Sequence, residues 1–289
     1  RETTFFTGIN GGIYTDFYYA IYRSNVVIKN FDIVEDLRDE DRLRLEAEAR
    51  FIRAICHWGA VKMYARPFGY TADNSHPGVP LRLEPSQDPL PRAAVGDVYQ
   101  QIVADLTFAA ENLPIENGVY ATQDAAKAYL AQVHFLMGNY SETAAFATEV
   151  INSGRYTLDD DLDRFETDVV NPETVFGIVS MPNDFRSSWF RDNLRSDNNP
   201  TPQLAFSEDF AFFMSLSGGG DGRSAWLTAG TRALINRFNE KEYFNVPLAH
   251  LTMLHLMRAE SYGELGTNLE TAIADINAIR ARAFGTGNN

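Results

Sequence analysis

Two alanine-rich amphipathic segments, separated only by the turn Gly138-Asn139-Tyr140, place the tightest limit on how this chain folds. They lie in the stretch "AAKAYLAQVHFLMGNYSETAAFATEVINSG", which runs from Ala125 to Gly154. Apolar residues recur at helical spacing in both segments: Ala126, Leu130, Val133 and Met137 in 124–137, and Ala144, Ala147 and Ile151 in 141–153. Small residues at facing positions let two helix axes approach closely. The pattern therefore predicts a tightly packed antiparallel helix pair.

A second hairpin of the same kind is expected near the C-terminus. The stretches "MGNYSETAAFATEVI" (137–151) and "LGTNLETAIADINAI" (265–279) share a glycine turn and an alanine-rich helix that follows it. Helix pairs that recur in this way are typical of solenoids of tetratricopeptide type. Leu130, Ala131, Gly138 and Tyr140 fall where that repeat has large, small, turn and aromatic residues. The fold class predicted is mainly α, built on such hairpins into an α superhelix, with little β structure.

The remaining periodic segments predict helices over 12–30, 40–66, 94–114 and 247–265, the last beginning at Pro247. The helix 40–66 is apolar over most of its circumference, which predicts burial on two sides and makes Trp58 a core residue. A narrow polar stripe remains on it: Glu46, Arg50, Arg53 and His57. Residues 65–93 form a long ordered loop, and 155–246 an irregular region with one strand in 173–181.

Composition excludes several classes of protein. The formal net charge of −14 disfavours binding to nucleic acid, which requires clustered Lys and Arg. The single cysteine, Cys56, cannot form an intrachain disulfide and is expected to be a small buried hydrophobic residue. No run of about 18 apolar residues predicts a membrane span. The sequence opens at Arg1 without an initiator Met, so we expect a processed or trimmed start.

Motifs for catalysis or for cofactor binding are missing from the sequence. There is no G-x-S-x-G and no H-E-x-x-H, and the five histidines are scattered. Asp159, Asp161 and Asp163 resemble the start of a calcium loop, but Arg164 and Val170 occupy the glycine and glutamate positions of that loop. The segment "SGGGDGRS" lacks the G-K-[ST] ending of a phosphate-binding loop, and its Asp221 and Arg223 are expected to pair locally. We therefore expect no enzyme, no cofactor and no metal.

Aromatic residues in irregular polar segments are the best candidates for binding a ligand. Rings stack on the apolar faces of sugars, while amide and guanidinium groups hold the hydroxyls. Trp189, Phe190, Arg191 and Asn193 form one such group, and Trp226 lies in another segment. Tyr70 and His76, from the loop 65–93, complete the candidate set. The alternative for the two tryptophans is a structural role, in which they pin the irregular region onto the helices.

Several blocks in order resemble the signatures of the SusD/RagB family over essentially the whole chain. The first is "EARFIRAICHWGAVKMYARPFG", followed by "GVPLRLEP", and the second is "PRAAVGDVYQQIVADLTFAAENLP". The third is "ATQDAAKAYLAQVHFLMGNYSETAAFATEVINSGRYTL", and "ETVFGIV" resembles the family's E-x-[IV]-F strand. The last is "VPLAHLTMLHLMRAESYGELG…AIADINAIRARA".

The resemblance implies a single SusD-like domain over 1–289, with a helical scaffold at about 12–154 and 247–283 and a variable, loop-rich ligand-binding lobe at about 155–246. It also implies a non-catalytic nutrient-binding lipoprotein at the surface of the outer membrane. Such a protein binds oligosaccharides, or in some members peptides, and delivers them to a SusC-like TonB-dependent transporter. The N-terminal lipid anchor that the resemblance implies is missing from this sequence. The alternative function is a helical-repeat scaffold that binds other proteins.

Overall fold

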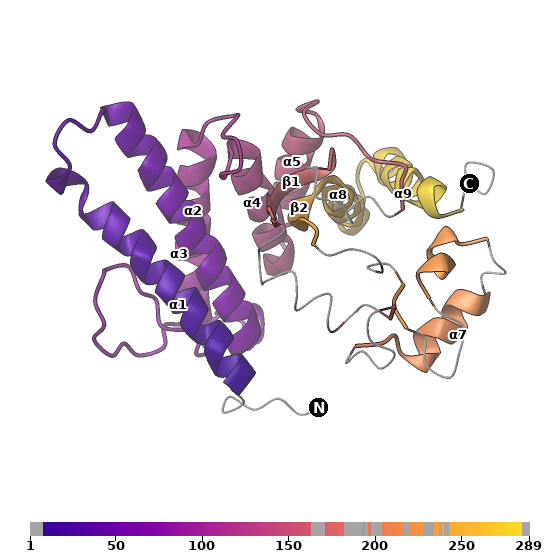
Figure 1. The fold of residues 1–289 in the computed structure, drawn as a ribbon, viewed down its shortest axis with the longest axis horizontal. Coiled ribbons are helices and arrows are strands. Elements are labelled where there is room, and N and C mark those ends of the chain that lie inside the picture. The colour runs from indigo at the N-terminus through magenta and orange to yellow at the C-terminus, as the bar shows by residue number, and fades with distance from the viewer. Residues whose placement is uncertain are drawn as a thin grey trace. The chain divides into compact units, whose positions relative to one another are not determined.

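The computed structural model describes residues 8–162, 171–181, 193, 196–197, 204–216, 220–227, 234–236, 239 and 243–284. The chain divides into two compact units, Arg1–Val150 and Ile151–Asn289. The described part is mainly helical, with one short two-stranded sheet, which confirms the predicted fold class (Figure 1). None of its helices combines the length and the apolar character that a membrane-spanning segment needs.

The first unit is a row of helices that pack in chain order. Its elements are α1 (Gly8–Lys29), the 3-10 turn η1 (Phe31–Ile33), α2 (Asp39–Tyr64), α3 (Val95–Asn112), α4 (Gln123–Met137) and α5 (Tyr140–Ile151). Helix α2 packs between α1 and α3, and α3 packs on α4 (Figure 1). The two-sided burial predicted for the helix 40–66 is thereby confirmed.

The hairpin α4–α5 is closed by the residues at its ends. The side chain of Thr122 accepts a hydrogen bond from the backbone N–H of Ala125 and caps α4. Gly138 ends the helix at φ 76°, a left-handed conformation that glycine adopts without steric cost. Across the hairpin, Thr143 Oγ1 donates to the carbonyl oxygen of Ala131 over 3.4 Å. The predicted antiparallel pair is therefore present.

The polar stripe of α2 is largely turned inward and joins three helices. Arg53 donates to both carboxylate oxygens of Asp105 on α3, at 2.8 and 2.6 Å, and to Asn25 Oδ1 on α1. Arg53, Asp105 and Asn25 are all buried. A buried charge is tolerated only when it is paired and hydrogen-bonded, and this network meets that condition.

The long loop between α2 and α3 is tied to the helices by side chains. Tyr18 donates to the carbonyl oxygen of Pro80 over 2.7 Å, and Asn25 Nδ2 donates to that of Arg82 over 3.0 Å. His57 Nε2 accepts the backbone N–H of Arg82. These bonds from α1 and α2 confirm the prediction of an ordered loop.

The second unit contains the sheet and the second hairpin. Its elements are β1 (Thr174–Ile178), α7 (Glu208–Leu216), the 3-10 turn η2 (Gly222–Trp226), β2 (Val246–His250), α8 (Leu251–Leu265) and α9 (Leu269–Phe284). β1 pairs antiparallel with β2, with Thr174 opposite His250 and Ile178 opposite Val246. The expected turn between the last two helices is present, and Gly266 ends α8 at φ 64°.

Two expectations for this unit were wrong. The segment from Pro247 to His250 is strand rather than helix, because its backbone pairs with β1 and α8 begins only where His250 caps the N–H of Met253. The irregular region also contains regular structure, namely α7 and the turn η2, and neither was predicted.

Buried ion pairs join the sheet to the second hairpin. Glu173, which directly precedes β1, is fully buried and pairs with Arg282 of α9. Thr252 of α8 donates to the same carboxylate. Between α8 and α9, Asp275 accepts from His255 at 2.6 Å and from Arg258 at 2.8 and 2.7 Å. Burial by itself would raise the pKa of Asp275, but the bonds from His255 and Arg258 outweigh burial and lower that pKa.

Candidate functional site

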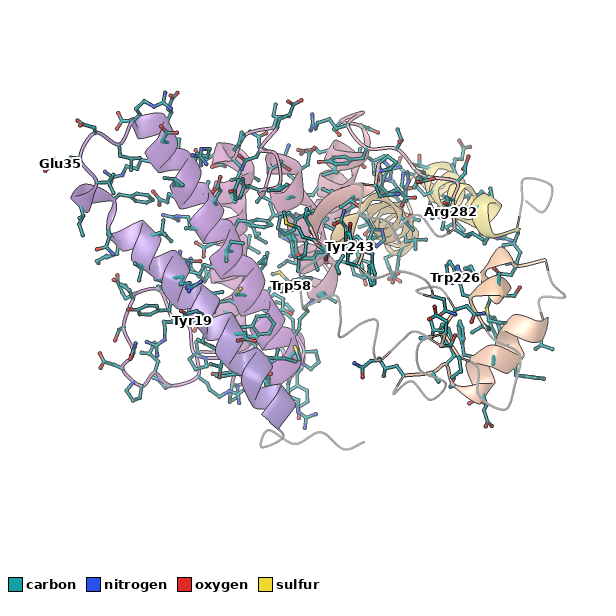
Figure 2. The ribbon with its side chains drawn as sticks, in the orientation of Figure 1. Tyr19, Glu35, Trp58, Trp226, Tyr243 and Arg282 are labelled. Atoms are coloured by element: carbon teal, nitrogen blue, oxygen red, sulfur yellow. The ribbon has the colours of Figure 1, made fainter. Side chains whose placement is uncertain are left out.

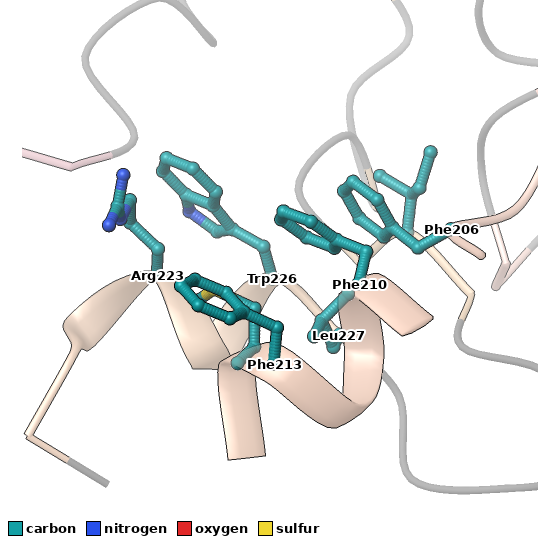
Figure 3. A pocket seen from close by; sticks show the side chains of 8 residues that line it. Phe206, Phe210, Phe213, Arg223, Trp226 and Leu227 are labelled. Atoms are coloured by element: carbon teal, nitrogen blue, oxygen red, sulfur yellow. The ribbon is translucent and has the colours of Figure 1, made fainter. Parts of the chain in front are cut away.

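A cavity of about 400 Å³ lies between α7 and η2 in the second unit (Figure 3). Its volume falls within the range of roughly 300–1,000 Å³ that is usual for small-molecule sites. The described residues that line it are apolar apart from one cation: Phe206, Phe210, Phe213, Met214, Arg223, Trp226, Leu227 and Ile235. The cavity is therefore suited to stacking and to apolar burial.

Helix α7 supplies one wall of the cavity through residues at helical spacing. Ser207 Oγ accepts a hydrogen bond from the N–H of Phe210, and Glu208 and Asp209 lie in the first turn, where negative charge is favoured. Phe210 and Phe213 then fall on the cavity side, and Phe210 stacks on Phe206 with ring centroids 4.8 Å apart (Figure 3).

The turn η2 holds the opposite side of the cavity. Asp221 accepts the backbone N–H of Arg223 over 3.0 Å and so caps the turn that carries Trp226. The carbonyl oxygen of Trp226 accepts the N–H of Asn236 over 2.8 Å, next to a bridge between Leu227 and Ile235. The backbone of Trp226 is thus fixed from both sides, while its indole stays half-buried at the cavity.

The cation at the rim of the cavity, Arg223, forms an ion pair with Asp221. Arg223 donates to both carboxylate oxygens of Asp221, with distances of 2.6 to 3.1 Å, so the predicted local pair is confirmed. The hydrogen bond from Arg223 holds the pKa of the buried Asp221 below its usual value. The guanidinium itself is largely exposed and lies 6.0 Å from the ring centroid of Phe284.

The sequence-based candidates have different surroundings. Trp226 lines the cavity. Asn193 is buried, and its carbonyl oxygen accepts the N–H of Leu204 over 3.1 Å. Trp189, Phe190 and Arg191 lie outside the described residues.

Tyr70 and His76 are brought together in the first unit, with ring centroids 5.4 Å apart. Tyr70 is exposed and lies under the guanidinium of Arg66, whereas His76 is buried against Thr71. The exposed ring is the member of this pair that a ligand can reach.

Most of the cavity lining was missed by reasoning from the sequence. Phe206, Phe210, Phe213 and Met214 belong to the unpredicted helix α7 or to the residues just before it. The signal that could have found that helix is Ser207 followed by Glu208 and Asp209, which is typical of a helix N-terminus. No sequence pattern marks Leu227 and Ile235 as cavity residues, because only the folded chain brings them to the cavity beside α7.

Within the described residues, no three His, Cys, Asp or Glu side chains are grouped so that they could hold a metal ion. Cys56 is half-buried rather than fully buried, and burial raises the pKa of its thiol to about 12. A neutral thiol is a poor nucleophile.

Comparison with known proteins finds one family to which part of the chain is similar. Residues 3–135 match a SusD-like family described as starch-binding and associating with the outer membrane. A curated relative, SusD-like protein P25 of Formosa agariphila, is 28% identical over 165 residues, which are 56% of this chain and 29% of that protein. The chain therefore matches less than a third of the length of this relative.

Solved structures agree in fold. A SusD superfamily protein from Bacteroides vulgatus superposes with a TM-score of 0.82 at 20% identity, over 97% of this chain and 68% of that one. A laminarin-binding SusD-like protein superposes with a TM-score of 0.71 at 22% identity, over 93% and 70%. A further SusD superfamily structure, from Bacteroides thetaiotaomicron, is covered over 65% of its length. These structures show that the chain has the SusD-like fold, and its residues 3–135 are similar to the SusD-like family.

Proposed function

We propose that this protein captures glycans at the bacterial cell surface without chemical conversion, and that the cavity between α7 and η2 is a ligand contact. The observation that carries this proposal is the aromatic cavity with a guanidinium at its rim, in a chain that matches, over residues 3–135, a family described as starch-binding and associating with the outer membrane. The laminarin-binding relative of the same fold supports the same class of ligand.

Recognition in this proposal depends on exposed rings. Phe213 is largely exposed and Trp226 is half-buried, so each offers a ring face to a bound sugar. The apolar face of a pyranose stacks on such a ring while its outward hydroxyls stay hydrated. Arg223 lies beside Trp226 and adds hydrogen-bond donors for hydroxyl oxygens (Figure 3).

The proposed partner is a SusC-like TonB-dependent transporter, which receives the captured oligosaccharide. We further propose that a lipid anchor N-terminal to this sequence holds the protein on the outer membrane. Both proposals follow from the match of residues 3–135 to a family whose description includes association with the outer membrane. Peptide ligands are the alternative cargo.

Glycan binding is tested by calorimetry with laminari-, malto- and xylo-oligosaccharides on wild-type protein. Replacing Phe213 or Trp226 by Ala is expected to weaken binding by up to about tenfold, since loss of stacking on one ring removes roughly 0.5–1.5 kcal/mol. Phe212→Ala is the matched control, because Phe212 and Phe213 are 66% and 68% exposed on the same helix and only Phe213 lines the cavity.

Three results would count against the proposal. If the Phe212→Ala and Phe213→Ala variants bind the oligosaccharide with equally reduced affinity, the cavity does not contact the ligand. If wild-type protein releases reducing sugar, the protein hydrolyses the glycan rather than only binding it. A flat oligosaccharide panel would reject glycans of these classes as cargo.

A further inference from the structure

Among the residues that the structure describes, the side chains that line the cavity offer hydrogen-bond donors but no strong acceptor. Seven of the eight lining residues are apolar or aromatic, and the eighth is Arg223. A guanidinium and an indole N–H only donate, and the thioether of Met214 accepts weakly. The carboxylate of Asp221, the partner of Arg223, is buried and already accepts three side-chain hydrogen bonds from Arg223.

The backbone beside the cavity adds little acceptor capacity. The carbonyl oxygen of Trp226 accepts from Asn236, and Leu227 is bridged to Ile235. Carbonyl oxygens in the interior of α7 are used by the helix itself. A group that enters the cavity with an O–H or N–H donor would therefore lose its hydrogen bond to water, at an unfavourable free energy.

This imbalance discriminates between groups that could fill the cavity. A pyranose carries several hydroxyls, and a peptide carries backbone N–H groups, so both bring donors. An aromatic acyl ester brings a flat ring and carbonyl oxygens, which only accept. Its ring matches the walls formed by Phe210, Phe213 and Trp226, and its carbonyl matches Arg223 at the rim (Figure 3).

The dimensions also fit such a group. A cavity of about 150 Å³ lined by apolar side chains takes up one benzene ring. The cavity here has a volume of about 400 Å³, so it has room for a ring together with a short acyl chain. The hydrogen bonds of Arg223 to described residues all go to Asp221 and use its Nε and Nη2, so its Nη1 is available to a carbonyl oxygen at the rim.

We propose that the cavity binds an aromatic acyl substituent of the ligand, meaning a phenyl ring joined by a short chain to an ester carbonyl, rather than a bare sugar ring. The inference rests on the proposed function in one respect, which is that the captured glycan carries this acyl group. The sugar chain itself would then lie along the exposed rings outside the cavity.

The test uses three probes with the same phenyl ring and different polar ends: methyl 3-phenylpropanoate, 3-phenylpropan-1-ol and N-acetylphenylalanine amide. Affinities are measured by calorimetry on the whole chain. The ester is expected to bind about tenfold more tightly than the alcohol or the amide, because each of these leaves a donor without an acceptor. Phe213→Ala is expected to weaken ester binding about tenfold, and Phe212→Ala to leave it unchanged.

A second variant tests the guanidinium. Arg223→Lys keeps a cation beside Asp221 but loses the planar fork, so the preference for the ester over the alcohol is expected to shrink. Thermal unfolding of each variant shows whether it folds. If Arg223→Lys does not fold, the comparison of Phe213→Ala with Phe212→Ala decides the question.

The outcomes separate this inference from the proposed function. Absence of ester binding, or ester binding that Phe213→Ala leaves unchanged, overturns the acyl site even if oligosaccharides bind. Equal affinity for the amide and the ester also overturns it, in favour of a peptide side chain. Tight, Phe213-dependent ester binding with a flat oligosaccharide panel supports the acyl site and rejects capture of those glycans.

Discussion

The helices α1–α4 of the first unit and the α7–η2 segment of the second both gather aromatic rings, but they use them in opposite ways. In the first unit, Phe51 and Trp58 of α2 meet Tyr129 of α4 edge-on, with ring centroids 5.5 and 5.6 Å apart, and all three are buried. Figure 2 labels Trp58 in this unit. In the α7–η2 segment, Phe210 and Phe213 are exposed around a cavity. The same residue type thus fills a core in one region and lines a cavity in the other.

Charges differ between the two regions in the same way. Arg53 and Asp105 are both buried, and their pairing is part of the core. In the pair Asp221–Arg223 only the carboxylate is buried, and the guanidinium reaches the rim of the cavity. The difference teaches that loss of a side chain in the helical region should lower stability, whereas loss in the α7–η2 segment should lower ligand affinity.

The largest expected change in stability follows from breaking the buried ion pair between Arg53 and Asp105. Asp105→Ala leaves Arg53 charged and unpaired in the core, and should lower the free energy of unfolding by about 3–5 kcal/mol. Urea unfolding followed by circular dichroism measures this change. Lys29→Ala is the control, because the pair Lys29–Glu84 is more than half exposed and should contribute only about 0–1 kcal/mol.

A double variant separates the loss of the pair from the loss of packing. Arg53→Met together with Asp105→Leu removes both charges and keeps apolar volume, so it should recover much of the lost stability. If Asp105→Ala costs no more than Lys29→Ala, the buried network does not hold the helices together, and the contrast between the two regions fails.

A pair of phenylalanine variants tests the contrast directly. Phe51 is fully buried, so Phe51→Ala should cost about 3–5 kcal/mol of stability. Phe213 is 68% exposed, so Phe213→Ala should change stability by no more than about 0.5 kcal/mol. Both are measured by urea unfolding without ligand. A large loss of stability for Phe213→Ala would make α7 a structural element rather than a wall of a binding site.

Buried His57 makes the helical region sensitive to acid. Burial, with a further contribution from the charge of Arg53, lowers the pKa of His57 from 6.5 to about 3. Between these two values the unfolded state binds a proton that the folded state does not, so stability falls as the pH falls through this window. The slope that this residue contributes is about 1.4 kcal/mol per pH unit.

The slope is measured from urea unfolding at several pH values between about 4 and 6, which lie inside this window. His57→Gln should reduce the slope by most of that amount, while also costing some stability at neutral pH. His134→Gln is the comparison, since His134 is only half-buried and its pKa is lowered by burial to a lesser degree. An unchanged slope in His57→Gln would show that His57 is protonated inside the fold.

Much of the fold could be predicted from the sequence, because the apolar periodicity of a helix is visible within a short stretch of residues. Apolar spacing found α1 to α5 and α9 to within a few residues, and Gly138 marked the turn of the α4–α5 hairpin. Pro247 was misleading, since a proline suits a strand as well as the first turn of a helix when its missing N–H is not needed.

The site was harder to predict, because its parts meet only in the folded chain. Trp226 was chosen as an aromatic residue in polar surroundings, and it does line the cavity. The phenylalanines of α7 were overlooked, since a helix of nine residues gives a short periodic signal within irregular chain. The partners Arg53 and Asp105 are 52 residues apart, and no local pattern links them.

The smallest expected effect concerns two helix glycines with different surroundings. A Cβ at Gly59 of α2 would lie 2.6 Å from the ring of Phe17 on α1, whereas a Cβ at Gly263 of α8 would meet nothing within 4 Å. Ala is favoured over Gly inside a helix, so Gly263→Ala should raise stability by about 0.5–1 kcal/mol. At Gly59 the same gain is opposed by overpacking that costs about 1–3 kcal/mol, so the net effect should be destabilising. Urea unfolding measures both, and a stabilising Gly59→Ala would mean that α1 can shift away from α2, so that the helical region is less tightly packed than its buried network implies.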